Sequence, residues 1–445
     1  MAGALLTDLY ELNMAASYLR RGMDEPATFS LFVRRLPPSR GFLVAAGLEA
    51  CLDFLSYFSF EEDDLRYLSE TLGYDDATIE AFRALRFEGD VWAVPEGRVV
   101  LANEPLLEVT APIAVAQLVE TYLLNQVTFQ TAIASKAARC RIAARGADLV
   151  DFAFRRTQGA EAAMAVARTT AIVGFVATSN VEAARRYGLR AAGTMAHSFI
   201  EAFPSEEEAF RAFARDFPDR VTFLVDTYDT LNGVRTAIRV IRELGLADRL
   251  GIRLDSGDLE ALSREARRIL DEAGLPSVRI FASGGLDEHD IDALTGSGAP
   301  IDAFGVGTKM GVSADAPYLD SVYKLVEYAG RPVVKLATDK VTLPGRKQVF
   351  RSPEGDVIGL REEEPPPGAE PLLVPVMRGG RRTGPPGTIA EARARFEADL
   401  ERLPAAARRI SDPEPPVPAI SEHLARLSEE ARVDALRRAG VTSGT

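Results

Sequence analysis

The spacing of apolar positions changes several times along the chain. Residues 5–75 combine helical spacing, as in LYELNMAASYLRR and AAGLEACLDFLSYF, with one strand-like run, ATFSLFVRRL. Residues 86–112 alternate apolar and polar side chains between glycines and prolines, which is typical of hairpin strands, and residues 114–145 then predict two helices. After residue 321 hairpin strands are expected again, followed by a proline-rich segment and terminal helices.

A different pattern covers the middle of the chain. From residue 149 a short apolar run, a polar or glycine-rich loop and an amphipathic helix recur, and the seven runs are LVDFAF, TAIVGFVA, LRAAGTMA, RVTFLVD, RLGIRLD, VRIFAS and IDAFGVG. Ser205 and Glu208 form a capping box before one of these helices, and a glycine closes another. Alternating strands and helices require parallel strands joined by helical crossovers, and seven runs favour a barrel over an open sheet.

Composition excludes several classes of protein. The 445 residues are 47% apolar, enough for two or three buried cores, and the net charge of −13 argues against binding to nucleic acid or to an anionic membrane. Asp8 and Glu11 interrupt the place where a signal peptide would need a basic and then an apolar run, and no stretch is long enough to span a membrane. Cys51 and Cys140 lie in apolar helical patterns without metal-ligand spacing. We therefore expect a cytoplasmic protein with buried thiols.

Polar side chains gather in the loops after the seven runs. These loops are RRTQG, TSN, HSF, TYDT, SGD, SGG and GT, and they bring together hydroxyls, carboxylates, arginines, glycines and a histidine. Active sites of α/β barrels are built from the loops at the carboxyl ends of the strands. The pattern therefore predicts an enzyme that binds a polar ligand carrying several negative charges.

Two of the loops are rich in glycine. ASGG, residues 282–285, and FGVGT, residues 304–308, each follow a strand, and glycine lets backbone N–H groups approach phosphate oxygens without hindrance from a Cβ atom. Either loop alone is equally well read as an ordinary turn between a strand and a helix. Together, on the last two strands, they favour a phosphate site.

Charged side chains accompany these glycines. Strand alternation puts Arg253 and Asp255 on one face and Leu254 on the other, so that a cation and a carboxylate point toward the same end of the barrel, although a purely structural ion pair is the alternative. Asp226 and Asp229 supply carboxylates that hold ribose hydroxyls or phosphate-bound Mg²⁺ in such sites. A lone histidine at a strand end is more often a hydrogen-bonding residue than a catalyst. His197 faces two phosphate loops, however, which favours a base or a nucleophile.

Taken together, these residues make the chain similar to one family, the nicotinate phosphoribosyltransferases. The resemblance extends from LLTDLYELNMA through FRRTQG, GTMAHSF, RLDSGDL and FGVGT to YKLV and KLATDKVTLPGRKQVFR, over roughly residues 5–351 and in the same order. It implies an incomplete α/β (TIM-like) barrel, expected here over residues 116–324. It also implies an N-terminal α+β domain, residues 1–115, completed by the hairpin strands and helices of residues 325–445, and a homodimer with sites shared across the interface.

The reaction implied by the resemblance joins nicotinate to 5-phosphoribosyl 1-diphosphate and gives nicotinate mononucleotide and diphosphate, a step of NAD biosynthesis. Mg²⁺ is the implied cofactor, and ATP is the implied co-substrate, hydrolysed through a phosphorylated histidine that matches His197. Arg253 and Asp255 are the other residues expected to be catalytic.

The resemblance also implies binding roles. Nicotinate would contact Tyr10, Phe152, Thr194, Arg253, Ser179 and Asn180, with the two aromatic rings on its two faces. The phosphoribosyl group and its phosphates would contact Arg155, Asp226, Ser283, Gly284, Gly285, Gly305, Gly307 and Thr308, and Asp226 with Asp255 would hold Mg²⁺ indirectly. Ala153 departs from the family pattern, because relatives often have glycine there, and its methyl group is expected to shift the ring pocket slightly.

Four other functions were weighed against this one. In nicotinamide phosphoribosyltransferases an aspartate matches Ser179 and accepts a hydrogen bond from the carboxamide, so a neutral serine favours the acid over the amide. Quinolinate phosphoribosyltransferases are typically shorter and lack the histidine motif. A catalytically silent nucleotide-binding relative is disfavoured by the presence of His197, Arg253 and Asp255. A generic sugar-phosphate isomerase or aldolase explains the glycine loops but neither TDLY nor the histidine motif.

Overall fold

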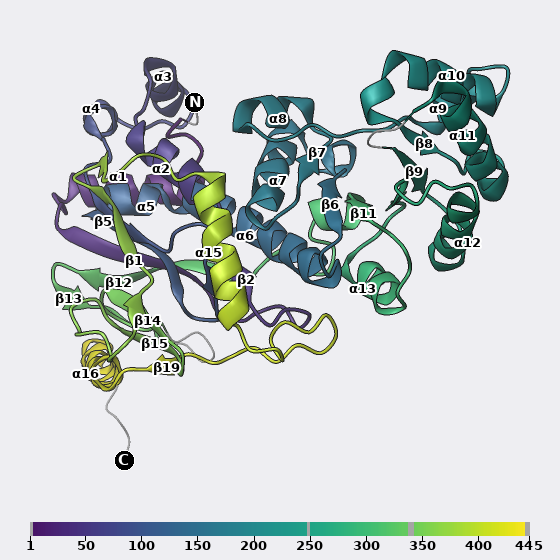
Figure 1. Cartoon of the computed structure of the whole chain (residues 1–445). Helices are drawn as coiled ribbons and strands as arrows, with labels where there is room; N and C mark the ends of the chain where they lie inside the picture. Colours follow the sequence, from purple (N-terminus) through teal and green to yellow (C-terminus); the bar gives the residue numbers. More distant parts are fainter. Residues whose placement is uncertain (1–2, 247–249, 337–341, 441–445) are drawn as a thin grey trace. The chain divides into compact units, whose positions relative to one another are not determined.

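The computed structural model describes residues 3–246, 250–336 and 342–440, and the chain divides into two compact units (Figure 1). The first unit comprises Met1–Ala132, Tyr318–Ala407 and Pro413–Thr445, and the second comprises Ile133–Pro317 and Arg408–Asp412. Both ends of the chain thus build the first unit, while the second is nearly continuous in sequence.

Three sheets form the framework of the first unit. The largest has the strand order β13-β12-β1-β5-β3-β17-β18, with bounds Arg331–Pro332, Ser321–Tyr328, Pro26–Val33, Pro105–Pro112, Asp90–Ala93, Val374–Arg378 and Arg381–Arg382. The second has the order β16-β14-β15-β19, with bounds Glu370–Pro371, Lys347–Ser352, Gly355–Leu360 and Ala419–Ile420, and the third pairs β2 (Leu43–Val44) with β4 (Val99–Val100). The hairpin strands expected around residues 86–112 and after residue 321 are therefore present.

Helices cover these sheets. They are α1 (Leu9–Arg20), α2 (Leu48–Ser56), α3 (Glu62–Glu70), α4 (Asp76–Ala84), α5 (Ile113–Leu118), α15 (Ile389–Arg402) and α16 (Glu422–Arg438), and α16 runs beside β15 (Figure 1). Strand β1 pairs with β5 on one side and with β12 on the other, and its residues after Pro26 are all buried, several of them in the main apolar core of this unit. Phe29 of β1 stacks on Tyr323 of β12 with ring centroids 4.8 Å apart.

The second unit is built on a six-stranded parallel sheet of the half-barrel type, in the order β7-β6-β11-β10-β9-β8. The strands are β7 (Ala177–Thr178), β6 (Asp148–Asp151), β11 (Ala303–Val306), β10 (Arg279–Ala282), β9 (Gly251–Leu254) and β8 (Thr222–Leu224). The incomplete α/β barrel expected from the sequence is confirmed. Long α6 (Glu120–Ala143) joins the two units in sequence.

Helices alternate with these strands. They are α7 (Ala160–Ile172), α8 (Val181–Tyr187), α9 (His197–Glu201), α10 (Glu206–Asp216), α11 (Thr230–Leu244), α12 (Leu259–Glu272), α13 (Glu288–Gly296) and α14 (Thr308–Gly311), with 3₁₀ turns η1 (Phe154–Arg156) and η2 (Pro218–Arg220). Helices α11 and α12 flank strands β8 and β9 (Figure 1), and their apolar faces bury Val234, Ile238, Ala266 and Leu270 in one core with Ile252 of β9.

Three local predictions need correction. The run TAIVGFVA, residues 170–177, was expected to be a strand, but its first three residues end helix α7 and only Ala177 lies in β7. The run LRAAGTMA was expected to be a seventh strand, but it makes only an isolated bridge between Ala191 and Thr178, because its alanines and glycine have low strand propensity and little side chain to bury. The capping box at α10 is half formed. The Ser205 hydroxyl accepts a hydrogen bond from the N–H of Glu208, but the Glu208 carboxylate does not return one to Ser205.

A buried charged cluster fixes helix α13 against α6. Lys136 of α6 pairs with Glu288 at 2.6 Å and with Asp315 at 3.1 Å, and Arg139 donates to Glu288 at 3.0 Å. Arg139 also donates to the carbonyl oxygens of Arg409 and Ile410, which holds residues 408–412 in the second unit. Burying so many charges is tolerated because each finds a partner of opposite sign.

Candidate active site

Arg253 is the centre of a hydrogen-bond network at the carboxyl ends of β9 and β10. Its guanidinium donates to Asp255 Oδ1 at 2.6 Å, to Ser283 Oγ at 2.7 Å and to Thr194 Oγ1 at 3.1 Å. The side chain is only 13% exposed, so these bonds form away from bulk water. Strand alternation buries Leu254 on the opposite face, as the sequence predicts.

Asp255 carries the negative charge of this network. Burial pushes the pKa of its carboxyl upward, but a hydrogen bond from Ser283 and the adjacent Arg253 outweigh that effect and hold the pKa below its ordinary value. Asp255 is therefore ionised at neutral pH. Its Oδ2 atom lies 3.9 Å from His197 Nε2.

Asp226, after β8, supplies a second carboxylate to the same place. Its Oδ2 atom accepts hydrogen bonds from the N–H of Asp255 at 2.9 Å and from the Ser256 hydroxyl at 2.7 Å, whereas its Oδ1 atom is buried without a hydrogen-bond partner. An orphaned carboxylate oxygen beside an ionised carboxylate fits Mg²⁺, which proteins bind through one or two carboxylates together with substrate phosphates. Among the residues that the structure describes, no group of three or more acidic, histidine or cysteine side chains forms a complete metal site.

His197 is the first residue of helix α9, and its side chain is 41% exposed. Its Nδ1 atom is joined by a hydrogen bond of 3.1 Å to the Thr227 hydroxyl, and its Nε2 atom faces Asp255. One ring nitrogen is thus fixed by Thr227 while the other points toward the carboxylate and solvent. Thr227 lies in the loop TYDT, but the sequence analysis did not single it out because hydroxyl residues are common in such loops.

Phe152 forms an aromatic wall below Arg253. The guanidinium carbon of Arg253 lies 5.5 Å from the centroid of the Phe152 ring, and the ring packs on Gly305, where an added Cβ would come within 2.8 Å of it. Gly305 is therefore required for packing, and it is buried rather than open to a ligand. The methyl group of Ala153 is accommodated by Gly311, where an added Cβ would lie 2.5 Å from the Ala153 Cβ atom.

Asp151 is a buried acid that the sequence analysis did not select. Its side chain accepts hydrogen bonds from the Thr178 hydroxyl at 2.7 Å and from the N–H of Ala153 at 2.8 Å, and burial raises the pKa of the carboxyl although these bonds oppose the shift. The carbonyl oxygen of Asp151 also accepts from the N–H of Ser179. Asp151 therefore links the loops after β6 and β7, and its position at the end of an apolar strand was the signal available in the sequence.

Two polar residues cap helices rather than facing the network. Asn180 is fully buried, and its side-chain oxygen accepts from the N–H of Ala183 at 3.1 Å, which caps α8. Asp229 likewise accepts from the N–H of Asn232 and caps α11. Ser179, by contrast, is only half-buried and follows the end of β7.

The two glycine loops differ in what requires glycine. Gly284 has φ +107°, and an added Cβ would lie 2.0 Å from the carbonyl oxygen of Asp255, so the loop is in direct contact with β9. Gly285 has φ +75° with open space around it, and Gly307 lies against the carbonyl oxygen of Phe152. Thr308 begins α14 and is exposed.

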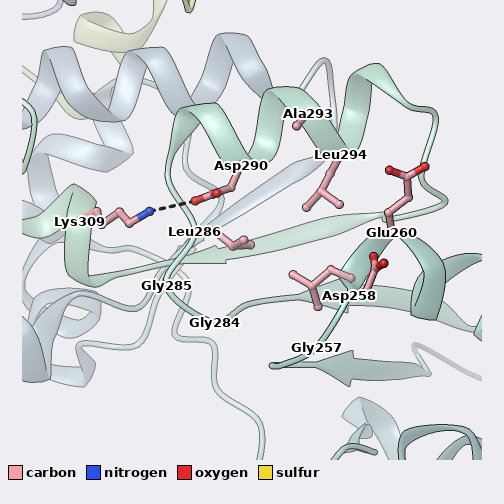
Figure 2. Close-up of a pocket in the computed structure, with 11 residues that line it drawn as sticks. Gly257, Asp258, Glu260, Gly284, Gly285, Leu286, Asp290, Ala293, Leu294 and Lys309 are labelled. Carbon is pink, nitrogen blue, oxygen red and sulfur yellow. Dashed lines mark hydrogen bonds and ion pairs between the residues drawn. The ribbon is translucent and has the colours of Figure 1, made fainter.

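A cavity of about 520 Å³ opens beside Gly284 and Gly285 (Figure 2). Its wall includes Asp258, Glu260, Asp290 and Lys309, and Figure 2 shows the Lys309 side chain reaching across to Asp290. Lys309 was not selected from the sequence, although it directly follows Thr308. Its ammonium is held by two carboxylates, those of Asp287 and Asp290.

Two expected residues form no hydrogen bond with this network within the described residues. Arg155 is exposed on η1, and Tyr10 belongs to the first unit, on α1. Tyr10 is 52% exposed, so it is not a core residue of that unit, and its hydroxyl donates to the buried Glu11 at 3.1 Å. Burial raises the pKa of the Glu11 carboxyl to about 7.

Comparison with known proteins places the chain in a family. Models of three nicotinate phosphoribosyltransferase domains match it: the N-terminal domain over residues 5–128, the family's central model over residues 147–349 and the C-terminal domain over residues 364–428. The last match lies beyond residues 5–351, over which the motifs of the resemblance extend.

Relatives and solved structures agree with these models. The chain is 49% identical to a nicotinate phosphoribosyltransferase of Mycobacterium tuberculosis over 92% of this chain and 89% of the relative, and 47% identical to that of Bacillus subtilis over 81% and 77%. The crystal structure of the human nicotinic acid phosphoribosyltransferase matches with a TM-score of 0.84 and 31% identity, over 95% of this chain and 99% of that one. Since the matches extend over nearly the whole chain and include the network around Arg253, the chain belongs to the nicotinate phosphoribosyltransferase family.

Proposed function

We propose that this protein joins nicotinate to 5-phosphoribosyl 1-diphosphate, giving nicotinate mononucleotide and diphosphate, with coupled hydrolysis of ATP. The observation that carries the proposal is the arrangement of Arg253, Asp255 and His197 in a chain that belongs to this family over nearly its full length. The relatives are named nicotinate phosphoribosyltransferases. The polar network of this chain contains a guanidinium and carboxylates, which are groups that this reaction can use.

Nicotinate binds, in this proposal, against the Phe152 ring with its carboxylate toward Arg253 and Thr194. An aromatic wall below a guanidinium suits an aromatic acid, because the ring stacks while the carboxylate is paired with a fixed positive charge. The pairing of Arg253 with Asp255 restrains the guanidinium, so less freedom is lost when the substrate binds.

The bond that breaks joins C1 of the ribose to the diphosphate, and a new bond forms from C1 to the pyridine nitrogen. Departure of diphosphate builds positive charge on the ribose, which the ionised Asp255, together with the neighbouring Asp226, stabilises. Asp226 and Asp255 would hold Mg²⁺, which neutralises the leaving diphosphate when bound. The loops around Gly284 and Gly307 receive the phosphates, and Arg155 supplies a further cation.

His197 acts in the coupling to ATP rather than in the glycosyl transfer. Its imidazole accepts the γ-phosphoryl group of ATP, the bond between the β- and γ-phosphates breaks, and water later takes the phosphoryl group. Phosphorylation puts negative charge within reach of Asp255, and the resulting repulsion shifts the balance between binding and release of the substrates. We further propose a homodimer in which Tyr10 of one subunit covers nicotinate in the other.

The test compares the wild-type protein with His197→Asn. Wild type is incubated with nicotinate, 5-phosphoribosyl 1-diphosphate and Mg²⁺, with and without ATP, and both nicotinate mononucleotide and inorganic phosphate are measured. We expect ATP to accelerate synthesis in wild type, and we expect the variant to lose ATP hydrolysis and acid-labile phosphorylation while keeping slow synthesis without ATP. A His197→Asn protein that hydrolyses ATP at the wild-type rate would exclude this role.

A further inference from the structure

Helix α14 is too short to be stable alone. It spans four residues, Thr308–Gly311, and the N–H of Gly311 donates to the carbonyl oxygen of Gly307. A single turn of helix makes too few hydrogen bonds to offset the conformational entropy that is lost in forming it. The position of α14 therefore depends on its contacts with other elements. On one side, α14 packs through Gly311 against Ala153 and Thr157 beside η1.

On its other side, α14 is tied to α13 by one side chain. Lys309 Nζ lies 3.1 Å from Asp287 Oδ2 and 3.1 Å from Asp290 Oδ2, the first residue being the N-cap of α13 and the second lying in its first turn. These two carboxylates also form the capping box of α13, since Asp287 accepts from the N–H of Asp290 and Asp290 accepts from the N–H of Asp287. Lys309 thus holds the part of α13 that directly follows the loop of Gly284 and Gly285 (Figure 2).

That loop is in turn fixed to the residue that carries charge in the active site. Gly284 lies so close to the carbonyl oxygen of Asp255 that no other residue fits there, and Ser283 donates to the Asp255 carboxylate. Beneath α13, the buried pair of Lys136 and Glu288 fixes the same helix to α6. A displacement of α14 relative to α13 therefore changes the separation between Thr308 and Asp255.

The surrounding charges argue against Lys309 as a direct anchor for phosphate. Its ammonium is already paired with two carboxylates, and Asp258 on the same cavity wall adds a further negative charge, whereas Glu260 there is paired with Arg264. An anion placed there would face a net negative surface. A cation used for phosphate binding would be expected to have unpaired donors pointing into the cavity.

We propose that Lys309 is a positioning residue for the phosphoribosyl site, which clamps α14 to α13 so that the loops carrying Thr308 and Gly284 keep a fixed separation. The inference rests on the proposed use of 5-phosphoribosyl 1-diphosphate. It concerns a residue that touches neither nicotinate nor the reacting carbon, so its loss affects the binding of one substrate only.

The experiment uses the full chain and four variants, Lys309→Met, Asp290→Asn, their double mutant and the control Asp292→Asn. Asparagine at position 290 keeps an oxygen for the capping bond but loses the charge that pairs with Lys309. Asp292 is on the same helix and forms an ion pair of similar exposure with Arg145, away from α14. For each protein, KM is measured for both substrates together with kcat, and binding of 5-phosphoribosyl 1-diphosphate with Mg²⁺ is measured by calorimetry.

A clamp predicts that Lys309→Met raises the KM and the Kd for 5-phosphoribosyl 1-diphosphate about tenfold and that Asp290→Asn raises them about threefold, as expected for partly exposed ion pairs. In both single variants, KM for nicotinate and kcat stay within about twofold of wild type. The double mutant has the same KM and Kd for 5-phosphoribosyl 1-diphosphate as Lys309→Met, because both changes break one clamp. Asp292→Asn leaves all of these constants unchanged.

The contrary results are distinct. If Asp290→Asn lowers the KM or Kd for 5-phosphoribosyl 1-diphosphate, Lys309 is a direct ligand that the carboxylate restrains, and the clamp is wrong. Unchanged binding in Lys309→Met also overturns it. A wild-type protein that binds 5-phosphoribosyl 1-diphosphate but makes no nucleotide contradicts the proposed function, while the calorimetry of the variants still decides the role of Lys309.

Discussion

At the scale of single residues, three side chains carry the charges of the network around Arg253. Arg253 is the cation, Asp255 and Asp226 are the anions, and Ser283, Thr194 and backbone N–H groups supply neutral donors and acceptors. With two carboxylates and one guanidinium, this network leaves Arg253 as the charged partner for the carboxylate of nicotinate in the proposed complex, so any further negative charge near the Phe152 ring is unfavourable.

Ser179 gives a prediction about that balance. An aspartate at this half-buried position would lie near the proposed nicotinate carboxylate, and two like charges about 4 Å apart at an effective dielectric constant near 20 repel by roughly 4 kcal/mol. We expect Ser179→Asp to raise KM for nicotinate by two to three orders of magnitude, whereas the neutral Ser179→Asn changes it little. Steady-state kinetics on both variants checks this. A normal KM in Ser179→Asp would remove Ser179 from the pocket.

Some residues of the network could be predicted from the sequence and others could not. Arg253, Asp255, Asp226, Ser283 and His197 were predicted and lie together, because parallel strands bring the residues after their carboxyl ends to one edge. Asn180 was expected to contact nicotinate; the structure shows its buried side-chain oxygen capping α8, and the contact with nicotinate stays a prediction. Asp151 and Lys309 were missed because their partners, Thr178 and Asp290, are distant in sequence and visible only in the fold.

At the scale of secondary structure, the loops after the strands decide the geometry of the site. Amphipathic helices such as α11 and α12 were predicted because apolar residues recur on one face, and the strands β8 to β11 were predicted because they are short apolar runs. The strand predicted at residues 189–196 is reduced to a single bridge to Thr178, because the apolar pattern was counted without regard to the low strand propensity of its alanines and glycine. Gly284 was expected in a phosphate loop, but its close contact with the carbonyl oxygen of Asp255 could not be predicted from the sequence.

Gly284 and Gly285 form a matched pair for a test at this scale. Both have positive φ, but an added Cβ at Gly284 strikes the carbonyl oxygen of Asp255, whereas at Gly285 it meets nothing within 4 Å. We expect Gly285→Ala to cost about 1 kcal/mol of stability through backbone strain alone, with activity largely kept. Gly284→Ala should lose most activity, since the loop must move away from Asp255.

Thermal unfolding and initial rates distinguish the two variants. A Gly284→Ala protein as active as Gly285→Ala would show that the contact between this loop and β9 is unimportant for the reaction.

At the scale of the whole molecule, segments that are distant in sequence belong to the same compact unit, and local sequence patterns do not predict this. Residues 408–412 lie in the second unit because Arg139 binds their carbonyl oxygens, although the residues on both sides of them belong to the first. None of the helices in the described ranges is long and apolar enough to cross a bilayer. Tyr10 is half exposed on the first unit, which leaves its ring free to contact another surface.

Mixed dimers test the proposed use of that ring. If Tyr10 of one subunit completes the site of the other, chains carrying Tyr10→Ala and Arg253→Ala, each nearly inactive alone, should regain about one working site per mixed dimer. The measurement is the specific activity of mixed dimers isolated with two affinity tags, compared with each parent. Mixed dimers without recovered activity would mean that Tyr10 serves its own subunit's site or none.

The most direct test of the account is a competition among three pyridines in one reaction. Wild-type protein receives equal concentrations of ring-deuterated nicotinate, nicotinamide and unlabelled quinolinate with limiting 5-phosphoribosyl 1-diphosphate, ATP and Mg²⁺. The products are separated and measured by mass, and the label distinguishes nicotinate mononucleotide made from nicotinate from that made from quinolinate with loss of CO₂. Because one guanidinium faces the Phe152 ring and Ser179 is neutral, nicotinate mononucleotide should exceed the amide product by at least about a hundredfold. Nicotinamide mononucleotide as the main product, or no nucleotide from any of the three, would contradict the account.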